Sequence, residues 1–200
     1  NTLFVTIILV IANIMGGGMA LPQAVRLTRT RDTDGISGVW AGVSFTMNLW
    51  WLTYALANGL WGLVPVSVVA AVLYGTIGIV YLSIMGRRAA GQLLLGSLVL
   101  GMAPLPFLAL GGWELAGIAI GVCCAIQLVF AVIATWRTRD LTGVASMTWI
   151  MAWIESVIWL AYGSSVVDGA LLVGGVGGTV MASLIIVRLA VTGHQPFRVK

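Results

Sequence analysis

Glu155 is an acidic side chain within a long apolar stretch of the chain, and Trp159 follows it four positions later. Four positions are about one helical turn, so the carboxyl group and the indole are expected on the same face of a helix. A charged side chain at the centre of a bilayer costs about 2.5 to 3.5 kcal/mol on insertion scales, and such residues commonly mark ion or proton paths. The alternative is a protonated Glu155 that only hydrogen-bonds a neighbouring helix. Glu155 is therefore a candidate substrate-binding residue and a candidate proton site.

Other catalytic or metal chemistry finds little support in the sequence. The chain has a single histidine, His194, which excludes a histidine metal cluster. A Ser-His-Asp triad is not expected from a histidine near the C-terminus. Cys123 and Cys124 are adjacent in an apolar run and are expected to be buried, inert thiols. The glycine clusters match neither a Walker A nor a Rossmann fingerprint. We predict no catalytic residue, no metal and no cofactor, and expect that the protein is not an enzyme.

The composition is that of an integral membrane protein. Of the 200 residues, 60% are hydrophobic and 8% are charged, whereas roughly 25% are charged in ordinary soluble domains. The net charge of +4 could suggest a nucleic-acid partner, but the basic residues lie at the ends of apolar runs. The expected partners are therefore the lipid bilayer and a small solute, with no nucleic acid. Assembly into a homo-oligomer is left open.

Seven apolar runs each approach the length that a helix needs to cross a bilayer. Turn-type residues, among them Asn58-Gly59 and Gly111-Gly112, separate them. We therefore predict an all-α integral membrane protein with seven transmembrane helices. The runs are Thr2 to Val25, Ile36 to Ala57, Leu60 to Met85, Leu93 to Leu110, Leu115 to Ile133, Val144 to Ala161 and Ala170 to Val187.

The basic residues predict the orientation of these helices. Lys and Arg collect in cytoplasmic loops, and all ten basic residues fall on one side of the seven predicted spans. The opposite loops carry Glu114 and Asp168 without any Lys or Arg. The N-terminus is therefore expected outside and the C-terminus in the cytosol. Trp61 and Trp113 fall at predicted outer helix ends, where indoles commonly anchor helices at the headgroups.

An internal repeat organises the chain. Arg29-Thr30-Arg31-Asp32 returns 108 positions later as Arg137-Thr138-Arg139-Asp140, and the same offset superposes the Trp-Leu-x-Tyr segments that begin at Trp51 and Trp159. Two three-helix repeats can share one orientation only if a further helix separates them. The predicted layout is thus three plus one plus three helices: a first repeat over 1–85, a linker helix over 86–112, and a second repeat with a short cytosolic tail over 113–200. The counterpart of Glu155 is Met47, so the acidic site is one-sided.

Four features occur together in this chain: Leu21-Pro22-Gln23, the arginine-rich turn that follows it, the two Trp-x-x-Tyr segments and the duplication. In these features the chain resembles the PQ-loop and SWEET superfamily of small-solute transporters. The resemblance covers nearly the whole chain and agrees with the two-repeat, seven-helix members. It implies that Pro22 and Gln23 form a hinge near the cytosolic end of the first helix, because a proline removes a helical hydrogen bond; a static kink is the alternative. The second copy departs from this pattern, since Phe130-Ala131 occupies the Pro-Gln position.

The resemblance also implies a substrate site midway through the membrane. Trp51 and Trp159 match the tryptophans that surround the solute. Met47 and Glu155, each about one turn before one of these tryptophans, are further candidate substrate-binding residues. Two asparagines expected on the following helices do not match, because Ser67 and Gly175 stand at those positions. Asp168 matches an acidic residue at the outer end of the last helix.

The function that the resemblance implies is facilitated diffusion of a small sugar by alternating access. One alternative is a proton-coupled transporter of an amino acid or another charged metabolite, as in the cystinosin-like branch. Another is a non-transporting receptor of the same fold. In each case we expect a multi-pass protein, with the plasma membrane as the predicted location.

Overall fold

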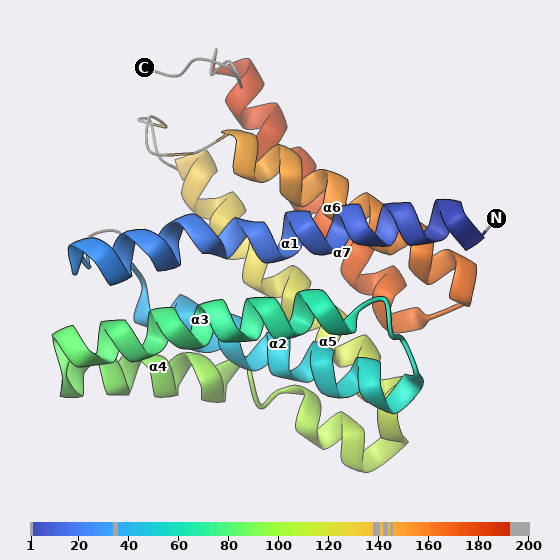
Figure 1. The fold of residues 1–200 in the computed structure, drawn as a ribbon, viewed down its shortest axis with the longest axis horizontal. Helices are drawn as coiled ribbons and strands as arrows, with labels where there is room; N and C mark the ends of the chain where they lie inside the picture. The colour runs from blue at the N-terminus through green and yellow to red at the C-terminus, as the bar shows by residue number, and fades with distance from the viewer. Residues whose placement is uncertain (1, 34–35, 138–140, 142–143, 145, 193–200) are drawn as a thin grey trace. The chain divides into compact units, whose positions relative to one another are not determined.

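The computed structural model describes residues 2–33, 36–137, 141, 144 and 146–192, and these residues form seven helices without a strand (Figure 1). The prediction of an all-α fold is therefore confirmed. Residues 138–140 of the second basic motif lie outside the described residues, as do His194, Arg198 and Lys200. The helices are α1 (Thr2–Thr30), α2 (Gly38–Asn58), α3 (Val64–Met85), α4 (Arg87–Val99), α5 (Pro104–Arg137), α6 (Ser146–Val166) and α7 (Gly169–Val191).

Four helices are long and apolar enough to cross a membrane, namely α1, α3, α5 and α7. The chain also presents large apolar side chains on its outside, such as Ile79 at 71% exposure and Leu110 at 81%. Apolar side chains on this scale suit a lipid environment, since extended apolar patches are rare on soluble monomers. Helices α2 and α6 have 21 residues each, which corresponds to about 31 Å. Each carries three Trp and several polar side chains, which lower its hydropathy.

The predicted helix over Leu93 to Leu110 is wrong, because the chain breaks within it. Helix α4 ends at Val99 and α5 begins at Pro104, with a turn between them. Proline lacks the N–H that would continue a helix and is favoured at a first helical position. By contrast, the expected break at Gly111 and Gly112 is confirmed. Gly112 has a φ of 63° and interrupts α5 with non-helical backbone.

The chain forms two compact units, one of residues 16–120 and one of residues 1–15 with 121–200. Helices α1 and α5 each contribute to both units. In the unit of residues 16–120, α4 packs along α2 through glycines. A Cβ atom on Gly42 would collide with the carbonyl of Leu93, and one on Gly96 with the carbonyl of Val39. The two backbones therefore approach as closely as glycine permits.

In the other unit, α7 packs against α6 on one side and α5 on another. A Cβ atom on Gly178 would collide with Ser156 of α6, whereas one on Gly177 would collide with Ala125 of α5. The Gly-rich segment of α7 thus serves close helix packing. Farther along, Trp136 of α5 donates from Nε1 to the carbonyl of Leu184 at 3.3 Å.

Equivalent residues make equivalent contacts in the two units. One apolar core contains Ile77 and Tyr81 of α3, and the other contains Ile185 and Leu189 of α7, which are their counterparts at the offset of 108. Further matched pairs occur in these cores: Ala24 with Val132, Ile36 with Val144, and Ala41 with Trp149. The internal repeat of the sequence is therefore also a repeat of packing contacts within each unit.

Candidate functional site

Helix α6 presents a polar, aromatic face that contains Glu155, Trp159 and Tyr162. The helical period places these three side chains on one side of α6, while Ser156 and Leu160 point towards α7, where they meet Gly178 and Gly175. The face with Glu155 is thus distinct from the face that packs on α7.

Glu155 and Trp159 contact each other directly. Trp159 Nε1 donates to Glu155 Oε1 at 3.1 Å, so the spacing of four residues brings together the two groups that the sequence singled out. Glu155 is partly buried, and Trp159 is buried with 9% exposure. Among the described residues of this unit, no Lys or Arg forms an ion pair with Glu155. The described part of this unit therefore supplies no cation to the carboxylate.

The rings of Trp159 and Tyr162 meet edge to face, with centroids 6.1 Å apart and planes at 69°. Trp51 and Tyr54 of α2 repeat this arrangement at 6.1 Å and 84°. Such T-shaped pairs are favoured because the positive ring edge meets the negative ring face. Each Trp-x-x-Tyr segment thus builds the same small aromatic wall on its own helix.

The surroundings of the first wall differ from those of the second. Tyr54 is buried and stacks edge to face on Trp113 of α5 at 6.4 Å. Trp113 also meets Trp50 at 6.4 Å, and Trp50 Nε1 donates to the Gly101 carbonyl. Trp113 thus packs within an aromatic cluster, and its expected role as a headgroup anchor stays a prediction. This cluster was not predicted from the sequence, although the adjacent pair Trp50-Trp51 was a signal for it.

Met47, the counterpart of Glu155, is buried with 2% exposure. It lies on α2 four positions before Trp51, where it fills space without a charge. The acidic group is thus present in one repeat and absent from the other, as the sequence predicted from the identities of the two residues.

Ser67 and Gly175, which stand at the positions of the expected asparagines, both serve helix packing. Ser67 is buried at 1% exposure and donates from Oγ to the Leu63 carbonyl at 2.9 Å. A Cβ atom on Gly175 would meet the backbone and Cβ of Leu160 at 2.8 Å. An asparagine side chain would not fit at Gly175 without moving α6. Contact of either residue with a solute remains a prediction.

Pro22 lies within α1, which continues as a helix on both sides of it. Pro22 is exposed and Gln23 is partly buried. Proline removes one backbone hydrogen bond, which weakens the helix locally even where the path of the chain stays helical. The hinge role of Pro22 and Gln23 remains a prediction.

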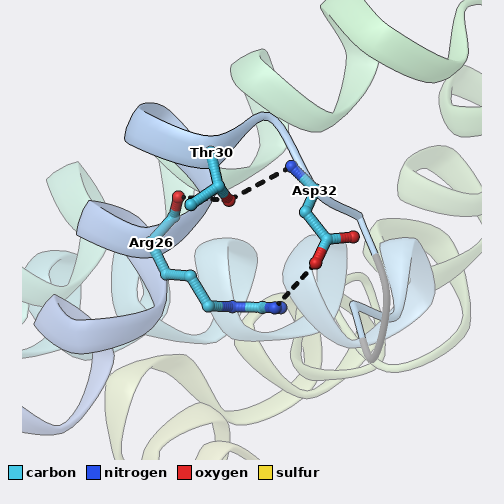
Figure 2. A network of polar contacts seen from close by, with 3 residues as sticks. All are labelled: Arg26, Thr30 and Asp32. Atoms are coloured by element: carbon cyan, nitrogen blue, oxygen red, sulfur yellow. Dashed lines mark hydrogen bonds and ion pairs between the residues drawn. The ribbon is translucent and has the colours of Figure 1, made fainter.

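The basic turn after α1 is held by a local network (Figure 2). Thr30 Oγ1 donates to the Arg26 carbonyl at 2.9 Å and accepts from the Asp32 N–H at 3.3 Å. Arg26 Nη1 forms an ion pair with Asp32 Oδ2 at 3.2 Å. Arg31 has a left-handed φ of 58° and donates from Nη1 to Ser83 Oγ of α3 at 3.0 Å. This turn therefore ends α1 and ties it to α3.

Asp168 is the N-cap of α7. Its Oδ1 accepts from the backbone N–H of Leu171 at 2.9 Å, which satisfies a donor that the first turn of a helix leaves free. Val167, directly before it, has a left-handed φ of 55°. The acidic residue that resembled a family feature thus has a structural role at this turn.

No family model matches the chain, and no curated protein matches it. Among the described residues, no group of three His, Cys, Asp or Glu side chains could hold a metal ion. Within its own unit, the candidate site on α6 consists of the Glu155 carboxylate, the Trp159 indole and the Tyr162 phenol. The aromatic cluster around α2 belongs to the other unit.

Proposed function

We propose that this chain is a SWEET-like, multi-pass membrane transporter that moves a small solute by alternating access. The observation that carries the proposal is the set of equivalent contacts in the two compact units, where Ile77 and Tyr81 correspond to Ile185 and Leu189. Transporters are commonly built from internal repeats, with the solute bound near the middle of the membrane. The proposed topology has seven spans in a three plus one plus three layout, with the N-terminus outside and the plasma membrane as the location.

The first candidate solute is a small sugar, carried down its gradient. Its support is the resemblance to SWEET transporters together with the aromatic walls formed by Trp51 with Tyr54 and Trp159 with Tyr162. A flat indole suits the apolar face of a sugar ring, and few polar groups are then needed to orient the solute. Met47 belongs to the proposed site as the residue one turn before Trp51, and Ser67 and Gly175 belong to it as the residues at the positions of the asparagines that the resemblance implies.

The second candidate is a proton-coupled transporter of an amino acid or another charged metabolite. It is favoured by the hydrogen bond from Trp159 to Glu155, which keeps a carboxylate on the aromatic face of α6. Ionisable groups within membrane spans often act as proton relays. A passive carrier of neutral sugars has no evident use for this group.

The experiment that tests the function is uptake of a labelled panel of sugars and amino acids into proteoliposomes that contain the purified chain. Uptake of a sugar that does not respond to an imposed pH gradient supports the facilitator. Uptake of an amino acid that an inward proton gradient accelerates supports the coupled transporter. Liposomes that take up no member of the panel faster than protein-free liposomes contradict transport of these solute classes.

A further inference from the structure

The carboxylate of Glu155 has one hydrogen-bond donor, the indole of Trp159, among the described residues. That bond occupies Oε1 and leaves Oε2 available. The two described arginines of this unit are placed elsewhere: Arg137 and Arg188 lie in the last turns of α5 and α7, and the guanidinium of Arg188 stacks 5.6 Å from the Trp136 ring centroid. A negative charge on Glu155 thus needs a cation that the described residues of this unit do not supply.

Three kinds of cation could meet this need: a metal ion, a proton or the ammonium group of a solute. A hard metal ion takes about six or more oxygen ligands, and the described residues hold no group of three acidic, histidine or cysteine ligands. An ammonium group, in contrast, needs only one carboxylate and gains further from aromatic faces within about 6 Å. Glu155 supplies the carboxylate, and Trp159 and Tyr162 place two aromatic rings on the next turn of the same helix.

We propose that Glu155, with the rings of Trp159 and Tyr162, forms a subsite for the ammonium group of an amine-bearing solute. This inference rests on the proposed transport function and names the chemical class of the solute within it. The carboxylate would accept a charge-assisted hydrogen bond through Oε2, while the indole holds Oε1 in place. The subsite is one-sided, because the equivalent residue Met47 is neutral and buried.

The test uses pairs of radiolabelled probes that differ at one group, glucose with glucosamine and lactate with alanine, at a pH where the amines are charged. Binding to the purified full chain is measured by scintillation proximity. In at least one pair we expect the amine to bind about tenfold or more tighter than its hydroxyl partner, as a charged hydrogen bond would give. Glu155→Gln should abolish this difference, and Glu155→Asp should retain part of it.

Glu114→Gln is the matched control, because Glu114 is an exposed carboxylate outside the proposed subsite. It should leave the preference for the amine unchanged. Thermal unfolding of each variant in detergent checks that the fold is kept. If Glu155→Gln unfolds, the amine preference of Glu155→Asp is the measurement that tests the subsite. Equal binding of the two members of every pair, a preference that survives in Glu155→Gln, or no binding of any amine would overturn the subsite.

The same probes separate this subsite from the proposed transport function. Counterflow in proteoliposomes that carries hydroxyl and amine members alike overturns the subsite and leaves transport standing. Amine binding that depends on Glu155 without any counterflow supports the subsite and contradicts transport. If a proton is the only cation that Glu155 binds, uptake depends on pH but shows no preference for the amine. That result also overturns the subsite.

Discussion

At the scale of single residues, the two Trp-x-x-Tyr segments share their ring geometry and differ in one contact. Trp159 donates its indole N–H to Glu155 at 3.1 Å, whereas the residue that corresponds to Glu155 in the first repeat is the apolar Met47. An indole that holds a carboxylate is fixed in orientation by that bond, since the N–H has one direction. The second repeat thus carries both the charge and the group that positions it.

Glu155→Gln is predicted to change the pH dependence of transport. In the wild type, protonation of the carboxyl group removes the negative charge, and with it the counter-ion of a cationic solute or the site of a carried proton. Glutamine keeps the shape of the side chain but does not titrate, so its uptake should vary less with pH. Uptake rates across a series of pH values, with Glu114→Gln as control, measure the effect. A variant with the wild-type rate and pH profile would make Glu155 structural.

Trp159→Phe is predicted to lower transport while the fold is kept. Phenylalanine retains an aromatic ring beside Tyr162 but lacks the N–H that holds Glu155.

Trp159→Ala is expected to lose transport and also to lower the free energy of unfolding by about 3–5 kcal/mol, because the side chain is buried. Trp51→Ala should lose transport with a smaller loss of stability, since Trp51 is only partly buried. Uptake and thermal unfolding, measured together, separate the two effects. If transport falls only in step with folded protein, these residues serve packing alone.

At the scale of elements, α4 belongs to the packing of the first repeat and not to a free linker. It lies along α2 with glycines at the contact, and Tyr81 of α3 donates from its hydroxyl to Gln92 Oε1 at 2.8 Å. Ser97 Oγ adds a bond to the Gly42 carbonyl at 3.3 Å. Polar bonds of this kind supplement close van der Waals packing between helices in lipid. We expect α4 to move with α2 and α3.

Gly96→Ala is predicted to destabilise the chain, and Gly91→Ala on the same helix is its control. A Cβ atom on Gly96 would collide with the backbone of α2. A Cβ atom on Gly91 would have no neighbouring atom within 4 Å. Overpacking of this kind costs about 1–3 kcal/mol, while Gly→Ala at an open helical site gains up to about 1 kcal/mol. Thermal unfolding in detergent should therefore move in opposite directions for the two variants. Equal shifts would refute close packing of α4 on α2.

Pro22→Ala is predicted to slow transport without abolishing solute binding. Alanine restores the backbone hydrogen bond that proline removes from α1, so a helix that must bend would bend less readily. Phe130→Ala is the matched control, because Phe130 occupies the equivalent position of the second repeat and is 63% exposed. It should change the rate less. Initial uptake rates and equilibrium binding are compared for both variants. Unchanged uptake by Pro22→Ala would leave the proline as a static feature of α1.

At the scale of the whole molecule, two units with matching cores recur in one chain. The close contact of Gly17 with Val69 in one unit corresponds, at the same offset, to that of Ala125 with Gly177 in the other. The glycine of this contact lies on α1 in one unit, as Gly17, and on α7 in the other, as Gly177. The two helices are in close contact in both units. Close approach of the two helices is therefore the shared feature, and the residue that permits it is interchangeable.

The proposed topology predicts which loops face the outside of a cell. Ser165 and Arg88 are both exposed, and they fall on opposite sides of the membrane in the seven-span arrangement. In a background where Cys123 and Cys124 are replaced by alanine, a membrane-impermeant maleimide added to intact cells should label Ser165→Cys and spare Arg88→Cys. Permeabilised cells should label both variants. The reverse pattern would invert the topology, and labelling of both in intact cells would refute an odd number of spans between them.

The sequence by itself determined the helical, membrane-like character of the chain, because apolar backbone in lipid can satisfy its hydrogen bonds only within helices or closed barrels. It also predicted that Glu155 and Trp159 share one face of a helix, and it predicted the break at Gly111 and Gly112. Both depend on local properties, namely the helical period and the conformational freedom of glycine. Such features need no knowledge of distant residues.

Only the tertiary structure decided features that depend on residues far apart in the chain. It placed Trp113 against Trp50 and Tyr54, and it docked α4 on α2 through Gly42 and Gly96. It also assigned Gly175 to close packing on α6, where the family pattern had suggested an amide. Apolar periodicity does not distinguish a lipid-facing side chain from one that faces another helix, because both environments are apolar. Which helices meet is decided by the fit of their surfaces, and that fit exists only once the chain is folded.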